Sequence, residues 1–264
     1  MRARSRGGEW LVRIEDLDST RCDPRHSRTI LAQLAACGLD PDAPPVYQSE
    51  RRDAYAEAIE SLREKGAIYP CGCTRKEIGA QANDGIYPGT CRNGLLPVRQ
   101  PRSLRLRCEQ APLVTFEDAI HGPCCQNLAE TVGDFVVQRA DGLHAYQLAV
   151  VVDDAWQGIS EVVRGADLLD NTPRQIWLQR LLDLPTPAYA HLPLLLNPDG
   201  SKLSKQSRAA PFDLDNPVPA LHFALDVLGQ QPPDELQHAS VVELLDWAVM
   251  HWNESRLRNN RYLS

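Results

Sequence analysis

The sequence lacks the features that would direct a chain into or across a membrane. No stretch of its 264 residues approaches the roughly 20 consecutive apolar residues that a bilayer-spanning helix needs. The basic start, Met1 to Arg6, is not followed by the apolar run of a signal peptide. We therefore expect a cytoplasmic protein. Hydrophobic and charged shares of 43% and 24% are ordinary for a globular protein that buries a full core.

A cationic excess is also lacking. The formal net charge is -7, which argues against a surface coated with positive charge for indiscriminate nucleic-acid binding. A local basic face remains compatible with this total, because arginines gather within residues 99–107 and 256–261.

The eight cysteines are too few for a disulfide scaffold of this length, so their spacing matters more than their number. Cys71, Cys73 and Cys91 lie in one polar segment and together offer the soft thiolate ligands that a structural zinc ion prefers. No histidine lies between the first and the last of them. The fourth ligand is then Tyr87, an acid such as Glu77 or Asp84, or a water. The alternative is a set of free surface thiols. Of the remaining cysteines, Cys37 is expected in the core and Cys22, Cys108, Cys124 and Cys125 have no assigned role. Cys124 and Cys125 are expected to lie in a loop.

The first apolar run, Trp10 to Ile14, predicts a buried strand that ends in an acidic loop. Glu15 then lies at the carboxyl edge of a sheet, where a carboxylate suits a ligand amine. The alternative is a turn whose acids cap the next helix. Apolar spacing predicts helices over about 26–37, where Ile30 and Leu34 share a face, and over about 52–65.

Most of the middle of the chain is predicted to form strands. Alternation predicts strands over 104–108 and 113–116, and Ala140-Asp141-Gly142 predicts a hairpin between strands 135–139 and 143–152. The second arm of that hairpin carries Tyr146. A third strand, 161–165, brings Arg164 to its end, where the guanidinium can pair with a carboxylate or a phosphate; the alternative is an ordinary surface arginine. Thr172 is predicted to cap a following helix, and Ser240 with Glu243 forms a capping box for another.

The loop from Gly200 to Gln206 has a composition that suits a phosphate. Lys202 and Lys205 are three residues apart and interleaved with serine hydroxyls, so they can gather positive charge around a polyanion. The alternative is a solvated lysine loop.

Four motifs in this order resemble the catalytic half of the class I glutamyl-tRNA synthetases: Arg13-Ile14-Glu15-Asp16-Leu17-Asp18, Tyr146 with Val151-Val152-Asp153-Asp154, Val163-Arg164-Gly165-Ala166-Asp167, and Lys202-Leu203-Ser204-Lys205. The cysteine set with Tyr87 and the short region after the loop make the chain more similar to the glutamyl-Q tRNA(Asp) synthetases, a paralogous family without the anticodon-binding domain. The resemblance implies ATP-dependent activation of L-glutamate as the adenylate, with Mg²⁺, and transfer to the queuosine base in the anticodon of tRNA(Asp).

The same resemblance implies roles for individual residues. Glu15, Tyr146 and Arg164 would contact glutamate. Lys205 would contact ATP, within the loop Lys202, Leu203, Ser204, Lys205 and Gln206. One structural zinc ion would be held by Cys71, Cys73, Tyr87 and Cys91. A monomer is expected.

The resemblance also implies an α/β fold, a Rossmann-like parallel sheet with a zinc-bearing α+β insertion and a helical C-terminal region. Residues 1–68 would form the first part of the catalytic domain, 69–143 the zinc-bearing insertion, 144–196 the second part of the catalytic domain, and 197–264 the lysine loop with the helical region.

One departure from the family pattern concerns the start of the chain. Family members begin with a strand and a His-x-Gly-Ser or His-x-Gly-His motif that opens a helix, and Met1 to Trp10 looks like the tail of that helix. We therefore expect a strand and most of a helix, about 30 residues for such a unit, to be missing. The expected explanation is a start codon assigned too late; the alternatives are a non-catalytic, zinc-stabilised tRNA-binding remnant and a fragment of a conventional glutamyl-tRNA synthetase.

Overall fold

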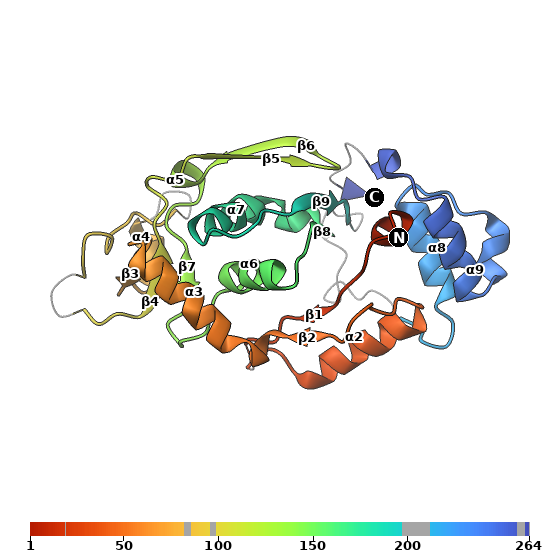
Figure 1. The fold of residues 1–264 in the computed structure, drawn as a ribbon, viewed down its shortest axis with the longest axis horizontal. Helices are drawn as coiled ribbons and strands as arrows, with labels where there is room; N and C mark the ends of the chain where they lie inside the picture. The colour runs from red at the N-terminus through yellow and green to blue at the C-terminus, as the bar shows by residue number, and fades with distance from the viewer. Residues whose placement is uncertain (19, 82–85, 96–98, 197–211, 258–261, 264) are drawn as a thin grey trace. The chain divides into compact units, whose positions relative to one another are not determined.

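The computed structural model describes all residues except 19, 82–85, 96–98, 197–211, 258–261 and 264 (Figure 1). By its internal contacts the chain divides into two compact units. The first unit is Met1–Gln48 with Leu192–Ser264, and the second is Ser49–His191. The domain boundaries expected from the sequence stay a prediction.

The first unit contains short parallel strand pairs and a group of helices. β1 pairs in parallel with β2, and β10 pairs in parallel with β11. Its elements are α1 (Arg2–Ser5), β1 (Arg13–Ile14), α2 (Pro24–Ala36), β2 (Val46–Tyr47), β10 (Leu194–Leu195), α8 (Val218–Val227), η4 (Asp234–His238), α9 (Val241–Met250), η5 (Glu254–Leu257) and β11 (Tyr262–Leu263).

Local sequence explains the helices of this unit. α9 begins after Ser240, and the capping box with Glu243 is present as predicted. α2 is also confirmed, but none of its residues is buried, and Ile30 is 44% exposed. Gly38 follows α2 with a φ of 63°, and a Cβ there would come within about 3 Å of Val241 and Leu245. Glycine therefore both ends the helix and lets α9 approach it.

The second unit combines an antiparallel sheet with a mixed one. The three-stranded sheet has the order β3-β4-β7 and is antiparallel. The four-stranded sheet has the order β6-β5-β9-β8, in which β5 is antiparallel to β6 and parallel to β9. Its elements are η1 (Gln48–Glu50), α3 (Arg52–Glu64), β3 (Ile68–Cys71), α4 (Arg75–Gln81), β4 (Ser103–Leu106), β5 (Leu113–Asp118), β6 (Gly122–Asn127), α5 (Leu128–Thr131), β7 (Val136–Gln138), α6 (Tyr146–Trp156), β8 (Glu161–Gly165), η2 (Ala166–Asn171), α7 (Thr172–Leu181) and β9 (Ala188–Leu192).

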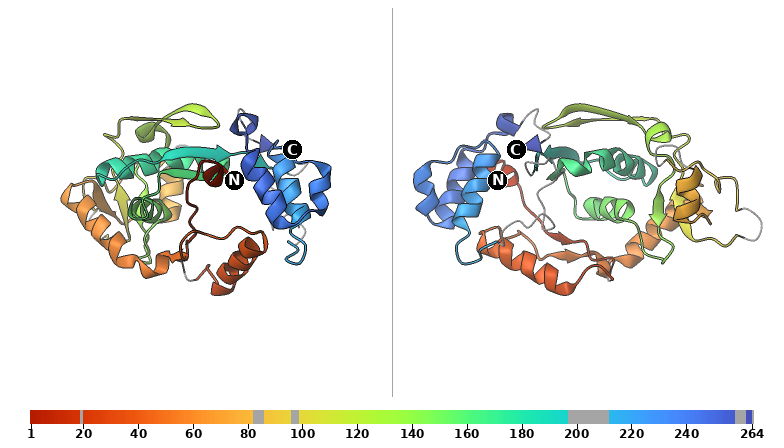
Figure 2. Two further views of the ribbon diagram at one scale, coloured as in Figure 1. Left: turned by 45° about the vertical axis from the view of Figure 1, so that its right-hand side comes forward. Right: turned by 180° about the vertical axis from the view of Figure 1, so that it is seen from behind.

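Helices cover the mixed sheet. α7 contacts both β5 and α6, and it lies between them in Figures 1 and 2. Ile176 of α7 and Tyr189 of β9 join Val114 and Leu128 in one buried apolar cluster. α3 is the predicted amphipathic helix, with Tyr55, Ile59 and Leu62 buried in a single stripe. The parallel strands and the antiparallel insertion confirm the expected α/β class, although the parallel pairs of the described residues fall in separate small sheets.

Three local predictions are wrong. Residues 146–156 form helix α6, whereas the sequence predicted a strand over 143–152; the turn at Gly142 is correct, but its second arm ends at an isolated bridge from His144. A helix buried over most of its surface shows an unbroken apolar run, as a buried strand does. The second error is at Thr172, which does not cap α7 with its side chain. The third concerns Cys124 and Cys125, which lie on strand β6 and not in a loop.

Of the helices that the structure describes, none is both long enough and apolar enough to cross a bilayer.

Candidate functional site

A cysteine–tyrosine cluster, defined as Cys71, Cys73, Tyr87 and Cys91, lies at one end of the antiparallel sheet. β3 delivers Cys71 at its last residue, and Cys73 follows two residues later. The ligand atoms of the three cysteines all lie within 4.8 Å of one another. Cys71 and Cys91 are fully buried, and Tyr87 is 4% exposed. Three thiols gathered this closely are placed to hold a metal ion.

The spacing of the sulfur atoms fits a tetrahedral ion. In a tetrahedral zinc site with Zn–S bonds of about 2.3 Å, two sulfur atoms lie about 3.8 Å apart. The Sγ atoms of Cys73 and Cys91 are 3.6 Å apart. A thiol is a weak donor and a weak acceptor, so hydrogen bonding alone gives little reason for three buried sulfurs to converge.

The candidates for a fourth ligand differ in whether their oxygen atoms lie near the three sulfur atoms. Both carboxylate oxygens of Glu77 are engaged elsewhere: Oε2 accepts from the amide and hydroxyl of Thr74, and Oε1 pairs with Arg99 at 2.7 Å. Asp84 lies outside the described residues. The Tyr87 oxygen lies 3.3 Å from Cys71 Sγ and 3.6 Å from Cys73 Sγ, and it also accepts the amide of Cys91 at 3.0 Å.

Two arginines give the cluster positive surroundings. The Arg105 guanidinium lies 3.9 Å from the centre of the Tyr87 ring, and Arg99 Nη1 donates to Cys73 Sγ at 3.5 Å. Burial opposes ionisation of Cys71, but hydrogen bonds from its neighbours, Tyr87 first, outweigh burial and lower the pKa of this thiol. These surroundings favour the thiolate of Cys71, which is the form that binds metals, whereas burial raises the pKa of Cys73.

A second group of polar side chains, the arginine cluster, consists of Asp118, Tyr146, Arg164, Thr172 and His191. Three of them come from the ends of strands: Asp118 ends β5, Arg164 lies one residue before the end of β8, and His191 lies one residue before the end of β9. Tyr146 and Thr172 are the first residues of α6 and α7. The site therefore forms where strands end and helices begin, which is the usual place for ligands in open α/β sheets.

Arg164 is the centre of this cluster. Its Nε donates to His191 Nε2 at 3.1 Å, its Nη2 donates to the Thr172 hydroxyl at 2.7 Å, and its Nη1 donates to the Tyr146 hydroxyl at 3.3 Å. Its guanidinium also lies 5.6 Å from the centre of the Tyr189 ring. Bonds in three directions hold the guanidinium plane, so Arg164 is a fixed cationic group and not a mobile surface arginine.

Asp118 and His191 lie beneath Arg164. Their side chains are 1% and 0% exposed, and His191 Nδ1 lies 2.6 Å from Asp118 Oδ2. Burial disfavours the charged form of Asp118, but hydrogen bonds from His191 and from two backbone amides outweigh it and lower the pKa of this carboxyl to about 2. Asp118 is therefore a carboxylate at neutral pH.

The remaining predicted residues belong to the first unit. Glu15 directly follows β1 and is exposed, so the expected position after a parallel strand is correct. The loop with Lys202, Leu203, Ser204, Lys205 and Gln206 lies outside the described residues.

Sequence reasoning missed Asp118, Thr172 and His191. Asp118 and His191 are 73 positions apart, so no local spacing relates them. The available signal was a single histidine within the apolar segment 188–196, which on its own indicates little. An acid of the second motif has a structural role: Asp153 is fully buried and accepts hydrogen bonds from Arg51 Nε and the Tyr55 hydroxyl, both at 2.7 Å.

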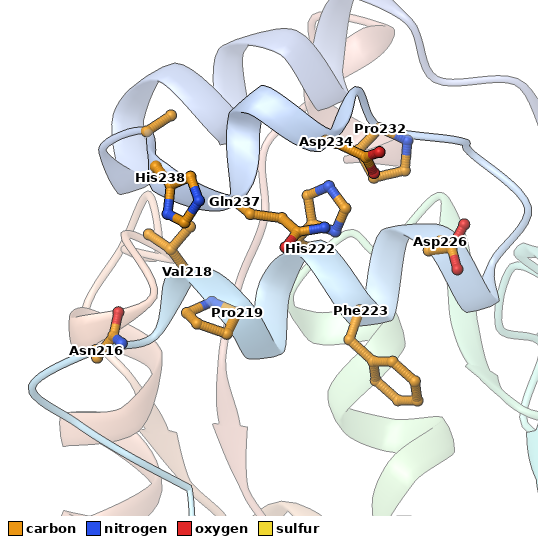
Figure 3. Close-up of a pocket in the computed structure, with 11 residues that line it drawn as sticks. Asn216, Val218, Pro219, His222, Phe223, Asp226, Pro232, Asp234, Gln237 and His238 are labelled. Atoms are coloured by element: carbon orange, nitrogen blue, oxygen red, sulfur yellow. The ribbon is translucent and has the colours of Figure 1, made fainter.

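The first unit also contains a hollow of about 660 Å³ beside α8 and η4 (Figure 3). His222, Asp226, Asp234 and His238 line it together with apolar neighbours. It includes none of the residues predicted to act on a substrate.

Known proteins are similar to this chain over most of its length. The family model described as tRNA synthetases class I (E and Q), catalytic domain, matches residues 1–216. A glutamyl-Q tRNA(Asp) synthetase of Thiobacillus denitrificans is 54% identical over 255 residues, which cover 95% of this chain and 84% of the relative. One of Ectopseudomonas mendocina is 49% identical over 99% of this chain and 88% of the relative. The chain belongs to the class I glutamyl- and glutaminyl-tRNA synthetases and, within that class, to the glutamyl-Q tRNA(Asp) synthetase family.

A solved structure supports the fold. The crystal structure of a glutamate tRNA ligase from Elizabethkingia meningosepticum, in complex with its amino acid, matches with a TM-score of 0.76 and 22% sequence identity. The match covers 99% of this chain and 62% of the solved chain, so this chain spans less than two thirds of that relative.

Proposed function

We propose that this protein activates L-glutamate with ATP and transfers it to the queuosine base of tRNA(Asp). The observation that carries the proposal is a guanidinium held rigidly beside a tyrosine hydroxyl at the strand ends, in a chain half identical to glutamyl-Q tRNA(Asp) synthetases. A fixed guanidinium suits a substrate carboxylate because its charge is held in place. Nε and Nη2 are bonded within the protein, and Nη1, beside the Tyr146 hydroxyl, is the nitrogen that donates to the substrate.

Each predicted residue then has a task. Arg164 pairs with one carboxylate of glutamate, Tyr146 donates or accepts a hydrogen bond beside it, and Glu15 binds the ammonium group. The α-carboxylate attacks the α-phosphorus of ATP, and pyrophosphate leaves. Lys205 stabilises the charge that builds on the leaving group. No protein nucleophile is needed, because positioning and fixed positive charge lower the barrier.

We propose in addition that the cysteine–tyrosine cluster holds one structural zinc ion. Cys71, Cys73 and Cys91 supply thiolates, and Tyr87 supplies the fourth ligand. In a tetrahedral site a Zn-bound sulfur and a Zn-bound oxygen lie about 3.5 Å apart, and the Tyr87 oxygen lies 3.3 and 3.6 Å from two of the sulfurs. A zinc ion with four protein ligands has no open position, so its contribution is to hold the loops around it in place.

Transfer of labelled glutamate tests the proposed function. The protein is incubated with ATP, labelled L-glutamate and tRNA(Asp) that either carries or lacks queuosine, and the RNA is then precipitated and counted. We expect label on the queuosine-containing tRNA alone. Equal labelling of both tRNAs would contradict the modified base as acceptor, and labelling of tRNA(Glu) would indicate a conventional glutamyl-tRNA synthetase.

A further inference from the structure

His191 is fully buried between a carboxylate and a guanidinium. Its Nδ1 faces Asp118 at 2.6 Å, and its Nε2 faces Arg164 Nε at 3.1 Å. From this geometry we infer that His191, oriented by Asp118, is a positioning residue that fixes Arg164 for the carboxylate of the substrate. The inference rests on the proposed function, since it assigns Arg164 to glutamate.

The hydrogen bonds determine which ring nitrogen carries the proton. An arginine guanidinium stays protonated in proteins, so the Nε–H of Arg164 can only donate, and His191 Nε2 must be the acceptor. The ionised Asp118 can only accept, so His191 Nδ1 must carry the hydrogen. The hydrogen bonds therefore place the imidazole hydrogen on Nδ1 and the acceptor on Nε2. The partner of one ring nitrogen thus sets what the other can do.

Asp118 is itself held in place. Its Oδ1 accepts the amides of Ile120 and His121 at 3.0 and 2.9 Å, which leaves Oδ2 directed at the imidazole. The side chains of Asp118, Thr172 and His191 are at most 1% exposed, and Arg164 is half-buried. A chain of bonds thus runs from the end of β5 through β9 to β8.

The bonds to Arg164 occupy one edge of its guanidinium. The Thr172 hydroxyl lies 3.1 Å from His191 Nε2 and also accepts Arg164 Nη2, so the three side chains close a triangle around one edge of the guanidinium. Nη2 also donates to the Leu168 carbonyl oxygen at 3.5 Å, so Nη1, which lies beside Tyr146, is the nitrogen that we assign to the substrate. A long side chain held in this way loses little further freedom when the substrate binds.

Steady-state glutamate activation tests the inference. Glutamate-dependent pyrophosphate exchange gives kcat/KM for glutamate and KM for ATP in His191→Leu, His191→Gln and Asp118→Asn. We expect His191→Leu and Asp118→Asn to lower kcat/KM for glutamate by about ten- to hundredfold, the range for a hydrogen bond to a charged group, and KM for ATP to change by less than about twofold. In Asp118→Asn the amide can donate to Nδ1, which moves the imidazole proton to Nε2 and sets it against Arg164. His191→Gln should lose less than His191→Leu, because its side-chain oxygen can accept from Arg164.

A double-mutant cycle separates positioning from a general structural role. If His191 acts through Arg164, adding His191→Leu to Arg164→Ala should lower kcat/KM for glutamate little further. If His191→Leu lowers kcat/KM for glutamate by the same factor in the wild type and in Arg164→Ala, the inference is overturned. It is also overturned if His191→Leu raises KM for ATP by as large a factor as it lowers kcat/KM for glutamate. Gln179→Met is the matched control, since it breaks a buried hydrogen bond to the Tyr189 hydroxyl and leaves the hydrogen-bond partners of Arg164 intact. We expect it to lower Tm without changing KM for glutamate.

The two proposals fail in different ways. If Arg164→Ala leaves kcat/KM for glutamate unchanged, the proposed role of Arg164 is wrong. If Arg164→Ala lowers it while folded His191→Gln and Asp118→Asn behave as wild type, only the role of His191 is wrong. Should His191→Leu fail to fold, the other two variants decide the outcome.

Discussion

The cysteine–tyrosine cluster and the arginine cluster belong to the same unit, and each places an arginine beside a tyrosine ring. Arg105 lies 3.9 Å from the centre of the Tyr87 ring, and Arg164 lies 5.6 Å from the centre of the Tyr189 ring. The clusters differ in what their other members offer. The first gathers three thiols and a phenol, which bond to one another weakly. In the second, a carboxylate bonds to an imidazole at 2.6 Å, and that imidazole and a hydroxyl accept from the guanidinium at 3.1 and 2.7 Å.

The difference indicates separate tasks. Weak mutual bonds among buried soft ligands favour a metal ion as the group that joins them. Strong bonds among complementary partners hold the arginine cluster without any added ion, so its guanidinium can be used for a ligand. Changes to the first cluster should therefore affect metal content and folding, and changes to the second should affect glutamate.

Removal of a thiol should have the largest effect. In Cys71→Ser we expect the zinc content to fall from about one ion per chain to near zero and Tm to fall by about 10 °C or more, because metal binding contributes directly to folding. Zinc is measured by mass spectrometry after gel filtration, and Tm by circular dichroism. Cys108→Ala is the control for a buried cysteine outside the cluster, and it should keep its zinc. Full zinc content in Cys71→Ser would exclude this residue as a ligand.

The fourth ligand is tested by Tyr87→Phe, which removes one oxygen and keeps the ring below Arg105. We expect zinc affinity to fall by about ten- to hundredfold, measured by competition with a chromophoric chelator. Tyr69→Phe is the matched control, because its buried hydroxyl bonds to Asp134 and not to the cysteines. Equal zinc affinities for Tyr87→Phe and wild type would mean that another group or a water is the fourth ligand.

Acid should weaken the second cluster through Asp118. Its pKa is about 2 in the folded chain against an ordinary value of 3.8, so the ionised carboxylate stabilises the fold above about pH 4. This contribution, about 2 kcal/mol, is lost as the pH falls from about 4 to about 2. Urea unfolding of wild type and Asp118→Asn should therefore give free energies that converge over this range. A constant difference between the two would contradict the assigned pKa.

The smallest effect is expected from Arg99→Met. Four anionic ligands give a zinc site a net negative charge, and the partly exposed Arg99 offsets some of it from 3.5 Å. We expect a loss of about three- to fivefold in zinc affinity, as for a screened surface interaction. Arg102→Met, a change at an exposed neighbouring arginine, should have no effect on affinity. Similar losses in both variants would indicate a general effect of net charge.

Local patterns predicted the elements that local physics determines. The buried stripe of α3 and the capping box at Ser240 were correct because spacing along one helix decides them. The cysteine cluster could also be predicted from the sequence, since Cys71, Cys73 and Cys91 lie close in sequence and carry distinctive chemistry. The strand predicted at Tyr146 was wrong because burial of most of the surface of α6 hides the helical period of its apolar residues.

The arginine cluster depended on contacts that no local pattern contains. The sequence singled out Tyr146 and Arg164, but it assigned Thr172 to a helix cap and gave no role to Asp118 or His191. Thr172 is at the predicted helix start, yet its hydroxyl turns to Arg164 and His191. Pairing of β5 with β9, which aligns Asp118 with Tyr189, brings the carboxylate to the imidazole, and only the folded sheet makes that pairing.

The separation of tasks is tested most directly by two measurements on one preparation of Arg164→Ala. Zinc content is determined by mass spectrometry and L-glutamate affinity by isothermal titration calorimetry, each beside wild type. We predict that the variant keeps about one zinc ion and binds glutamate about ten- to hundredfold more weakly. A variant that binds glutamate as tightly as wild type, or that loses its zinc, would contradict the account.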